Sequence, residues 1–351
     1  MYKKYMPSLL SLEKFSKKNK TVLVRIDSDV DIKSGKIIDD TRLLSSIQSI
    51  KKLLRLNSSI ILLGHLGRPE RHDIEETLLP VAQWYGKFLN LPVHDIASPF
   101  GGWQIGKTIR LHENLRFFME EEQNDEEFVK TLIEGADIYV NEAFAVSHRA
   151  HASIVGIPKY LPSYAGIHFM KEVQEMEKVL SNPKRPLAIL IGGAKIETKL
   201  PMVEKMHEVA DYVLVGGEVA SHTKELIKIQ HHTHPNRRSM VFVSDLIDSG
   251  LDITPQSTEN FIQVIKSAKT IVWNGPLGQT GKNPLTELST RAIAKAIADS
   301  HAYSIIGGGD TVSYLRQHKM LDKYDFVSVG GGAMLEYLSG AELPGIKALL
   351  R

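Results

Sequence analysis

The sequence predicts an α/β protein of two domains, each built on a parallel sheet with helices on its faces. Short apolar, β-branched runs alternate with longer segments of helical periodicity along the chain. The chain has 351 residues, and two domains are expected at roughly 150 residues per domain. Glycine-rich segments follow several predicted strands of the second half, as they do where helices follow strands closely.

The first half combines short predicted strands with a long amphipathic helix. The helix is Thr41–Leu56, whose apolar side chains share one face. β-branched and aliphatic runs of strand length supply the sheet. The predicted strands are Thr21–Ile26, Ser59–Leu63, Pro92–Ile96 and Asp137–Val140.

The second half repeats this alternation after a connecting helix. Between the halves, Ile167–Leu180 carries apolar residues at intervals of three, which predicts one amphipathic helix. Ser181-Asn182-Pro183 ends that helix, because proline cannot continue its hydrogen bonds. The predicted strands of the second half are Leu187–Ile191, Tyr212–Val215, Thr270–Trp273, Tyr303–Ile306 and Phe326–Val329.

The composition excludes several classes of protein. The formal net charge of +2, from 43 basic and 41 acidic side chains, argues against a nucleic-acid binder held by bulk electrostatics. The absence of cysteine excludes disulfides, thiolate metal sites, iron–sulfur clusters and a cysteine nucleophile, and fits a reducing compartment. No run of about 18 apolar residues occurs. We therefore expect a cytoplasmic protein that has no membrane span and binds no nucleic acid.

Four glycine-rich segments stand at predicted strand-to-helix junctions of the second half. Glycine lets the backbone approach a phosphate closely, and the following helix offers free N–H groups and the positive end of its dipole. Four such junctions in one domain favour a polyphosphate ligand over tight turns that merely pack. They are Gly192-Gly193-Ala194-Lys195, Gly216-Gly217-Glu218, Gly307-Gly308-Gly309-Asp310 and Gly330-Gly331-Gly332-Ala333.

Two lysines and one aspartate in this half are candidates for phosphate and metal binding. Lys195 and Lys199 are four residues apart, so one helical face carries both ammonium groups beside the glycine-rich turn. The alternative is a solvated lysine pair. Asp310 follows a glycine run, where a carboxylate can hold Mg²⁺ against phosphates or simply cap the helix.

The first half instead carries arginines in loops after predicted strands. Guanidinium groups match phosphate and carboxylate oxygens, so several that converge would bind a small, highly anionic metabolite. Taken singly, each is a surface residue. The candidates are Arg42, Arg68, Arg116 and Arg149.

Two further motifs are weaker. Gly101 to Thr108 matches a P-loop pattern, but Ile109-Arg110-Leu111-His112 alternates like a strand where a P-loop needs a helix. The histidines His231, His232 and His234 have metal-binding residue types but adjoin Pro235-Asn236, which favours a polar loop.

A series of motifs together resembles the phosphoglycerate kinase family. In the first half these are Arg25-Ile26-Asp27, Asp39-Asp40-Thr41-Arg42, His65-Leu66-Gly67-Arg68-Pro69, Glu113-Asn114-Leu115-Arg116-Phe117 and His148-Arg149-Ala150-His151-Ala152-Ser153. The second half continues with Gly192 to Lys195, Val272-Trp273-Asn274-Gly275-Pro276, Ile306 to Asp310 and Gly330 to Ala333. The ordered set extends from Val22 to Leu343-Pro344-Gly345, nearly the whole chain.

This resemblance implies two doubly wound, Rossmann-like domains joined by a hinge helix. The expected parts are an N-terminal domain, 1–165, for 3-phosphoglycerate and an interdomain helix, 166–182. A nucleotide-binding domain, 183–335, and a C-terminal segment, 336–351, which packs back on the first domain, complete the chain. The implied reaction is phosphoryl transfer between 1,3-bisphosphoglycerate and ADP, giving 3-phosphoglycerate and ATP, with Mg²⁺, in a monomer.

The resemblance also implies roles for individual residues. Arg42 and Lys195 would be catalytic, and Asp310 would hold magnesium. The acid substrate would be bound by Asp27, Asp29, Arg42, His65, Arg68, Arg116 and Arg149. The nucleotide would be bound by Gly193, Lys195, Lys199, Gly216, Gly217, Asn274, Gly307, Gly308, Gly309, Asp310 and Thr311.

Several positions depart from the family pattern. Asp27-Ser28-Asp29-Val30-Asp31 stands where the family usually has Asp-Phe-Asn-Val-Pro, so a carboxylate at Asp29 should repel the anionic substrate unless it is protonated or paired. The glutamate that usually binds the ribose is absent from Gln279-Thr280-Gly281, and Glu218 replaces a glycine near the adenine pocket. A catalytically weak or inactive relative that binds nucleotide is therefore the second hypothesis. An unrelated P-loop ATPase that uses Lys107 is the third.

Overall fold

The computed structural model describes residues 9–70, 73–194, 196–223, 239–281 and 283–350. They form two compact units. The C-terminal unit is Glu175–Ala341; the N-terminal unit contains the residues before Glu175 and those from Glu342 onward. The boundary falls inside helix α5 (Ile167–Ser181), the connecting helix predicted over Ile167–Leu180. In these ranges no helix has the length and apolarity needed to cross a membrane.

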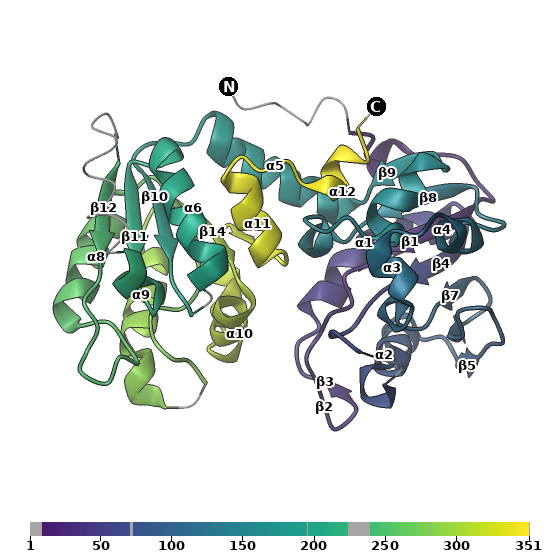
Figure 1. Ribbon diagram of the computed structural model, residues 1–351, viewed down its shortest axis with the longest axis horizontal. Coiled ribbons are helices and arrows are strands. Elements are labelled where there is room, and N and C mark those ends of the chain that lie inside the picture. Colours follow the sequence, from purple (N-terminus) through teal and green to yellow (C-terminus); the bar gives the residue numbers. More distant parts are fainter. Residues whose placement is uncertain (1–8, 71–72, 195, 224–238, 282, 351) are drawn as a thin grey trace. The chain divides into compact units, whose positions relative to one another are not determined.

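The N-terminal unit contains a seven-stranded sheet in the order β5-β6-β7-β4-β1-β8-β9 (Figure 1). Strand β1 pairs in parallel with β4 and β8, β4 with β7, and β8 with β9, while β6 is antiparallel to both its neighbours. A short antiparallel hairpin, β2 (Ile32–Lys33) and β3 (Lys36–Ile37), stands apart. The sheet strands are β1 (Thr21–Arg25), β4 (Ser59–Leu63), β5 (Val93–Asp95), β6 (Trp103–Ile105), β7 (Ile109–Leu111), β8 (Ile138–Asn141) and β9 (Ser163–Ala165).

The buried core of this unit joins the sheet to helices α1 (Thr41–Arg55) and α2 (Leu79–Leu89). Ile47, Ile50 and Leu53 of the predicted apolar face of α1 are buried, but Leu44, also predicted on that face, is exposed, and Leu43 is buried instead. Helices α3 (Met119–Gln123) and α4 (Glu126–Leu132) are shorter. The last helix of the chain, α12 (Pro344–Lys347), belongs to the same unit, where the Gly345 N–H donates to the Ser147 carbonyl at 2.8 Å.

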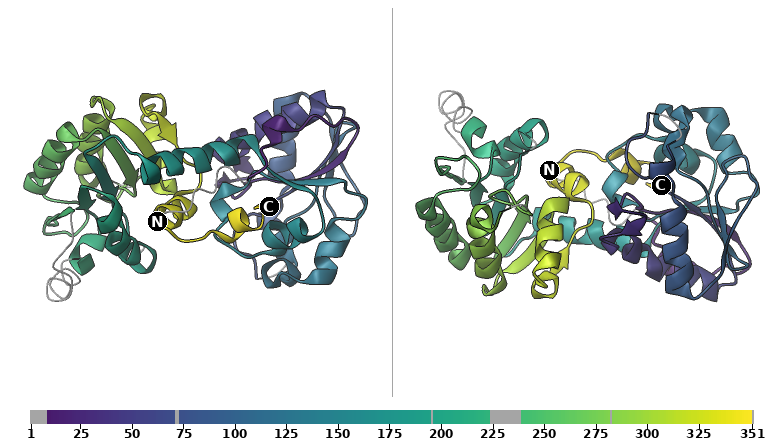
Figure 2. Two further views of the ribbon diagram at one scale, coloured as in Figure 1. Left: turned by 90° about the horizontal axis from the view of Figure 1, so that it is seen from above. Right: turned by 90° about the horizontal axis from the view of Figure 1, so that it is seen from below.

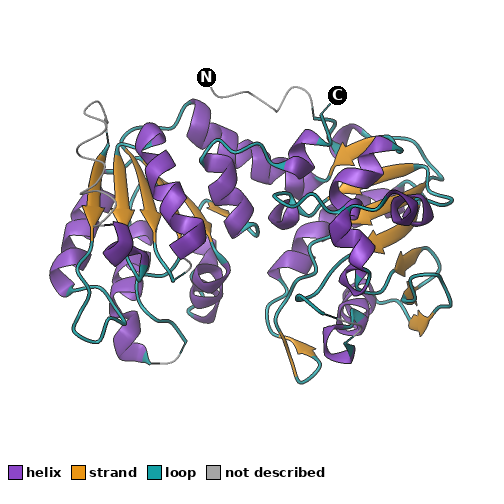
Figure 3. Cartoon of the chain, in the orientation of Figure 1, coloured by secondary structure: helices purple, strands orange, loops and turns teal. Residues whose placement is uncertain are grey.

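The C-terminal unit contains a six-stranded, fully parallel sheet in the order β12-β11-β10-β13-β14-β15. This is a doubly wound order: successive strands extend the sheet outward on both sides of β10, and helices flank it (Figures 2 and 3). The strands are β10 (Leu187–Ile191), β11 (Tyr212–Val215), β12 (Met240–Val243), β13 (Thr270–Asn274), β14 (Tyr303–Gly307) and β15 (Phe326–Val327). The helices are α6 (Ile196–Val209), α8 (Pro255–Ser267), α9 (Leu288–Ala298), α10 (Gly309–Gln317) and α11 (Gly331–Leu338).

The expected fold class is confirmed, and the predicted strands agree with the observed ones at their centres. The structure also confirms that Gly101 to Thr108 is not a P-loop, because β6 is followed by a tight turn and the antiparallel strand β7, with no helix. The histidines His231, His232 and His234 lie outside the described residues. The strands β6, β9 and β12 and the β2–β3 hairpin were not predicted; β6, β9 and the hairpin strands have only two or three residues each, too few for a periodic signal.

Glu142 holds the N-terminus of α5. This carboxylate is fully buried and accepts hydrogen bonds from the backbone N–H groups of His168 at 3.1 Å and Phe169 at 3.0 Å, and from the Ser49 hydroxyl at 2.6 Å. Burial raises the pKa of Glu142, and the hydrogen bond from Ser49 acts in the opposite direction. The first turn of the helix thus depends on one carboxylate supplied by the loop after β8.

Glu142→Ala should lower the free energy of unfolding by about 2 to 4 kcal/mol, because it leaves buried N–H and hydroxyl donors without an acceptor. Denaturant unfolding of the full chain measures the change. Glu134→Ala, which removes an exposed carboxylate of the same unit, is the control. An unchanged midpoint for Glu142→Ala would contradict this role.

Candidate functional site

The candidate substrate residues of the N-terminal unit come from loops after neighbouring parallel strands. The segment Asp27–Asp29 follows β1, His65 and Arg68 follow β4, Arg116 follows β7, and Arg149 follows β8. Since parallel strands end at the same edge, the order β7-β4-β1-β8 delivers these loops to one edge of the sheet. The spatial grouping expected of the arginines follows from this topology.

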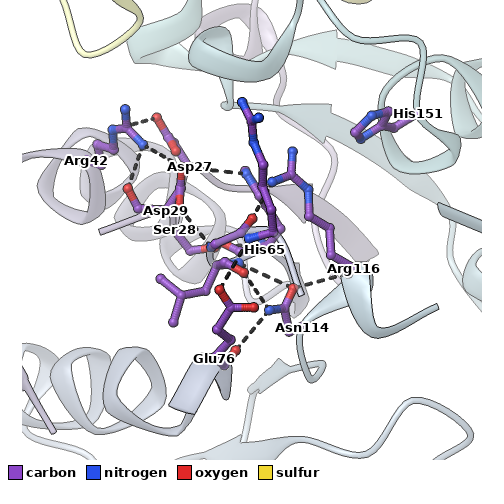
Figure 4. Close-up of polar contacts among 12 residues, drawn as sticks. Asp27, Ser28, Asp29, Arg42, His65, Glu76, Asn114, Arg116 and His151 are labelled. Atoms are coloured by element: carbon purple, nitrogen blue, oxygen red, sulfur yellow. Dashed lines mark hydrogen bonds and ion pairs between the residues drawn. The ribbon is translucent and has the colours of Figure 1, made fainter. Parts of the chain in front are cut away.

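Arg42, in the first turn of α1, contacts both aspartates of the loop after β1 (Figure 4). Its Nε lies 3.5 Å from Asp27 Oδ2, and its Nη1 lies 3.3 Å from Asp29 Oδ2 and donates to the Asp29 carbonyl at 2.5 Å. Asp27 is fully buried, and neither carboxylate oxygen accepts a hydrogen bond from the described residues. Burial raises the pKa of Asp27 and Arg42 opposes this, while Asp27 raises the pKa of Arg42. A buried acceptor therefore lies beside a permanent cation.

His65 and Asp29 face each other across this site (Figure 4). His65 Nε2 lies 4.0 Å from Asp29 Oδ2, and Asp29 Oδ1 accepts the Gly67 N–H at 3.0 Å. His65 is buried, and burial, with Arg25 next in effect, holds its pKa well below the usual range. At neutral pH this imidazole is an uncharged hydrogen-bonding group.

Arg116 is held by the same loop system. Its Nη1 donates to the Gly67 carbonyl, and its Nε lies 3.4 Å from Glu122 Oε1. Asn114 fixes the surrounding backbone, donating from Nδ2 to the Leu66 carbonyl at 2.8 Å and accepting the Arg116 N–H at 3.1 Å. Burial and then Arg149 lower the pKa of Arg116 to about 10, so it remains a cation at neutral pH.

Arg68 is exposed and Arg149 is half-buried. Arg149 nevertheless acts on its neighbours, because it contributes to the lowered pKa values of His148 and His151, for both of which burial is the largest cause. The pKa of His151 falls to about 3. Neither histidine was among the candidate residues, although both stand in the motif around Arg149.

The C-terminal unit contains a cavity of about 250 Å³ at the carboxyl ends of its strands. Its walls combine glycine backbone at Gly193, Gly217, Gly250 and Gly278 with apolar side chains, among them Leu251 and Leu277. The polar side chains that line it are those of Glu218, Gln279, Thr280 and Asp310. Apolar walls with a few polar groups are typical of a small-molecule site.

Glycine is needed where the loops after β10 and β13 meet. The Gly192 N–H donates to the Asn274 carbonyl at 2.9 Å, and the Gly193 N–H to the Pro276 carbonyl at 2.7 Å. A Cβ at Gly192 would lie 2.3 Å from the Pro276 oxygen. The strands β10 and β13 flank the point where the order of the sheet reverses, which is where such sheets bind ligands.

The other predicted nucleotide residues separate into two groups. Asn274 donates to the Gly331 carbonyl at 3.0 Å, the buried Thr311 hydroxyl accepts the Gly275 N–H at 2.9 Å, and Lys199 donates to the Gly192 carbonyl. These contacts shape the loops. Asp310 lies in the first turn of α10 and lines the cavity; the cap is Gly308 and has no side-chain bond, so Asp310 does not cap the helix. Lys195 lies outside the described residues.

The loop that lacks the expected ribose glutamate is fixed by another residue. Glu287 accepts the Gly281 N–H at 2.7 Å, and Gln279 and Thr280 line the cavity in its place. Glu218, the other departure, also lines the cavity. In the ranges that the structure describes, no group of three or more His, Asp or Glu side chains is arranged to hold a metal.

The doubly wound fold, a glycine-walled cavity in one unit and an arginine-rich anion site in the other define a phosphate-transferring α/β enzyme. The family model "Phosphoglycerate kinase" matches residues 12–238 and 226–341. The chain belongs to the phosphoglycerate kinase family, whose members are phosphotransferases.

Individual relatives agree over nearly the full length. The phosphoglycerate kinase of Dictyoglomus turgidum (strain DSM 6724 / Z-1310) is 35% identical over 391 aligned positions, which cover 97% of this chain and 98% of the relative. The phosphoglycerate kinase structures from Coxiella burnetii and Pyrococcus horikoshii OT3 have TM-scores of 0.80 and 0.83 and identities of 31% and 29%. Each comparison covers 97% of this chain and 98% of the solved chain.

Asp29→Asn should raise kcat/KM for 3-phosphoglycerate by about 2- to 10-fold, the scale of one partly exposed ion pair. Asparagine keeps an oxygen for the Gly67 N–H but removes the charge that competes with the substrate for Arg42. Steady-state kinetics measure the change. Asp31→Asn, on an exposed aspartate two residues away, is the matched control. A lower or unchanged kcat/KM would show that Asp29 does not oppose the substrate.

Proposed function

We propose that this chain catalyses reversible phosphoryl transfer between 1,3-bisphosphoglycerate and ADP, giving 3-phosphoglycerate and ATP, with Mg²⁺. The observation that supports it best is the site around Asp27, where a buried carboxylate with two unbonded oxygens lies beside Arg42, His65 and Asp29. A hydroxy acid with a phosphate group matches this set, because its hydroxyl can donate to Asp27 and its anionic ends can meet arginines.

In this proposal the roles in acid binding are divided among the residues after the strands. Asp27 accepts the substrate hydroxyl, His65 donates to an oxygen, and Arg116, Arg149 and Arg68 meet the phosphate. Arg42, which already contacts the Asp29 carbonyl, steadies the transferring group with Lys195. Asp29 belongs to this site by position and weakens binding by its charge.

The nucleotide occupies the cavity of the C-terminal unit. Gly193, Gly216 and Gly217 border the base, and Lys199, Asn274, Thr311 and Gly307 to Gly309 shape or contact the phosphate end. Asp310 suits Mg²⁺, because a carboxylate at the cavity wall and substrate phosphates together supply the oxygens that this ion prefers. Bound there, the ion would neutralise charge on the phosphates.

The reaction needs no covalent enzyme intermediate. In the ATP-consuming direction a carboxylate oxygen of 3-phosphoglycerate attacks the γ-phosphorus, and the bond to the ADP oxygen breaks. The protein contributes position and positive charge, which suffice for phosphoryl transfer. Since different units bind the two substrates, we propose that movement about α5 brings them together, in a monomer working in the cytoplasm.

ATP-dependent phosphorylation of 3-phosphoglycerate by the purified chain, with Mg²⁺, tests the proposal. Lys195→Ala should lower kcat by about 10²- to 10³-fold, the scale of one charge-stabilising contact. Lys205→Ala, on an exposed lysine of α6, should leave kcat unchanged. A folded chain that binds nucleotide but shows no turnover would instead be the inactive relative, which the departures at Asp29 and Gly281 make the second candidate.

Asp310→Asn should weaken binding of Mg-ADP by about tenfold or more, because it removes a charge that holds the metal–phosphate group. Calorimetry with and without EDTA measures the effect. The difference from the unmodified chain should vanish when the metal is removed. Asp322→Asn is the exposed control. An equal loss for metal-free ADP would assign Asp310 to the nucleotide alone.

A further inference from the structure

Arg25 is a buried arginine at the end of β1, and no role has been assigned to it above. Its side chain is 1% exposed and is among the largest fully buried side chains of the described residues. It interrupts an otherwise apolar strand, Thr21–Arg25. A cation so deeply buried must be compensated by hydrogen bonds and opposite charge.

All three guanidinium nitrogens of Arg25 have partners inside the N-terminal unit. Nε donates to the Ser153 hydroxyl at 2.8 Å, and Nη1 donates to the Ile26 carbonyl at 2.5 Å. Nη2 lies 3.0 Å from Nδ1 of the His65 ring. Arg25 therefore joins the buried interior to a residue of the substrate site.

The other end of this network is a buried carboxylate. The Ser153 hydroxyl donates to Glu121 Oε1 at 2.6 Å, and the Ser153 N–H donates to Glu121 Oε2 at 2.9 Å. Glu121 is fully buried. Ser153 thus accepts from Arg25 and donates to Glu121, so the charges of Arg25 and Glu121 compensate each other through one hydroxyl.

The contact with His65 has only one consistent proton assignment. A guanidinium has donors and no acceptor, so His65 Nδ1 must be the acceptor. The ring then carries its proton on Nε2, and it cannot become imidazolium without losing this bond. The His65 backbone is fixed as well, because its N–H donates to the Ser28 hydroxyl at 2.9 Å and its carbonyl accepts from that hydroxyl at 2.7 Å.

We propose that Arg25, held by Ser153 and Glu121, is a positioning residue that fixes His65 as the neutral Nε2–H tautomer, so that His65 donates to an oxygen of the anionic substrate. The position of Nε2 supports this, because it lies 4.0 Å from Asp29 Oδ2 and so faces the candidate substrate site (Figure 4). The identity of the substrate in this proposal rests on the proposed function, whereas the tautomer of His65 does not.

Most of the charged groups around the His65 ring also act against a second proton on it. Four cationic or potentially cationic groups disfavour a second proton on His65, and one carboxylate favours it. The cations come from β1, the turn after β7, α1 and the loop before residue 152, and the carboxylate from the loop after β1. They are Arg25, Arg116, Arg42, His151 and Asp29.

Nitrogen-15 NMR of the histidine-labelled full chain tests the tautomer directly. We expect the His65 ring to show an unprotonated Nδ1 and a protonated Nε2 from pH 5.5 to 8, with no titration. His65→Gln assigns the signals. A ring protonated on Nδ1, or one that titrates within this range, would overturn the proposal. This test needs no variant of Arg25, and its result does not depend on whether the chain phosphorylates 3-phosphoglycerate.

Arg25→Gln tests the positioning role, since an amide can donate or accept. We expect a mixed or titrating His65 ring, a KM for 3-phosphoglycerate about tenfold higher with a smaller change in kcat, and a new limb near pH 6.5 in kcat/KM. Arg25→Lys, which keeps a cationic donor, should restore the Nε2–H tautomer. Arg110→Gln, on an exposed arginine of β7, is the control.

Two results would count against the positioning role. One is an Arg25→Gln chain, folded by circular dichroism, whose His65 ring and pH profile match those of the unmodified chain. The other is loss of kcat with an unchanged tautomer, which would make Arg25 a structural residue. If Arg25→Gln does not fold, the double variant Arg25→Gln/Glu121→Gln, which removes both buried charges together, replaces it in the same measurements.

Discussion

The parallel pairing of one central strand in each unit is the constraint on which the rest depends. In the N-terminal unit β1 lies between β4 and β8, and in the C-terminal unit β10 lies between β11 and β13. Because these pairs are parallel, the loops that leave them emerge at one edge. Asp29 and His65 lie close together for this reason, and so do Gly192 and Pro276. The strand order therefore brings the loops of each site together, and the side chains of those loops then determine its chemistry.

The N-terminal site then requires buried charged groups beneath its loops. Burying Arg25, Asp27 and Glu121 carries a desolvation cost that an apolar interior would avoid. The Arg25–Ser153–Glu121 network offsets that cost by hydrogen bonding and by pairing opposite charges. Asp27 is compensated mainly by Arg42, at 3.5 Å, with smaller contributions from Arg25 and the Asp29 backbone, and its oxygens remain available to a ligand. Arg25 and Glu121 are thus bonded to each other's network, whereas Asp27 keeps oxygens without a hydrogen bond at the site.

The sequence predicted the parts of the structure that have a local signal. The strands Ser59–Leu63 and Leu187–Ile191 and the helix beginning at Thr41 were predicted because apolar periodicity determines them. β6 and β9 were missed, because a strand of three residues is too short to show an alternating pattern by itself. The motifs gave Asp27, Arg42 and His65 as site residues. Ser153 stood in a motif without a role and Glu121 stood in none, and the link of Ser153 to Arg25 spans 128 residues. Thr311 and Asn274 were expected at the nucleotide, and only the structure shows their loop-shaping bonds.

The N-terminal site combines permanently charged arginines with neutral histidines that can donate hydrogen bonds. Arg42 and Arg116 stay cationic at neutral pH, because even the lowered pKa of Arg116 is about 10. Burial and nearby arginines, Arg116 in every case, lower the pKa values of His65, His148 and His151 and keep these rings neutral. The arginines can therefore attract an anionic ligand, while the histidines orient it. A neutral imidazole with a fixed proton can do so because it has one donor and one acceptor. Asp29 acts against this arrangement, because it brings a negative charge to Arg42 before any substrate arrives.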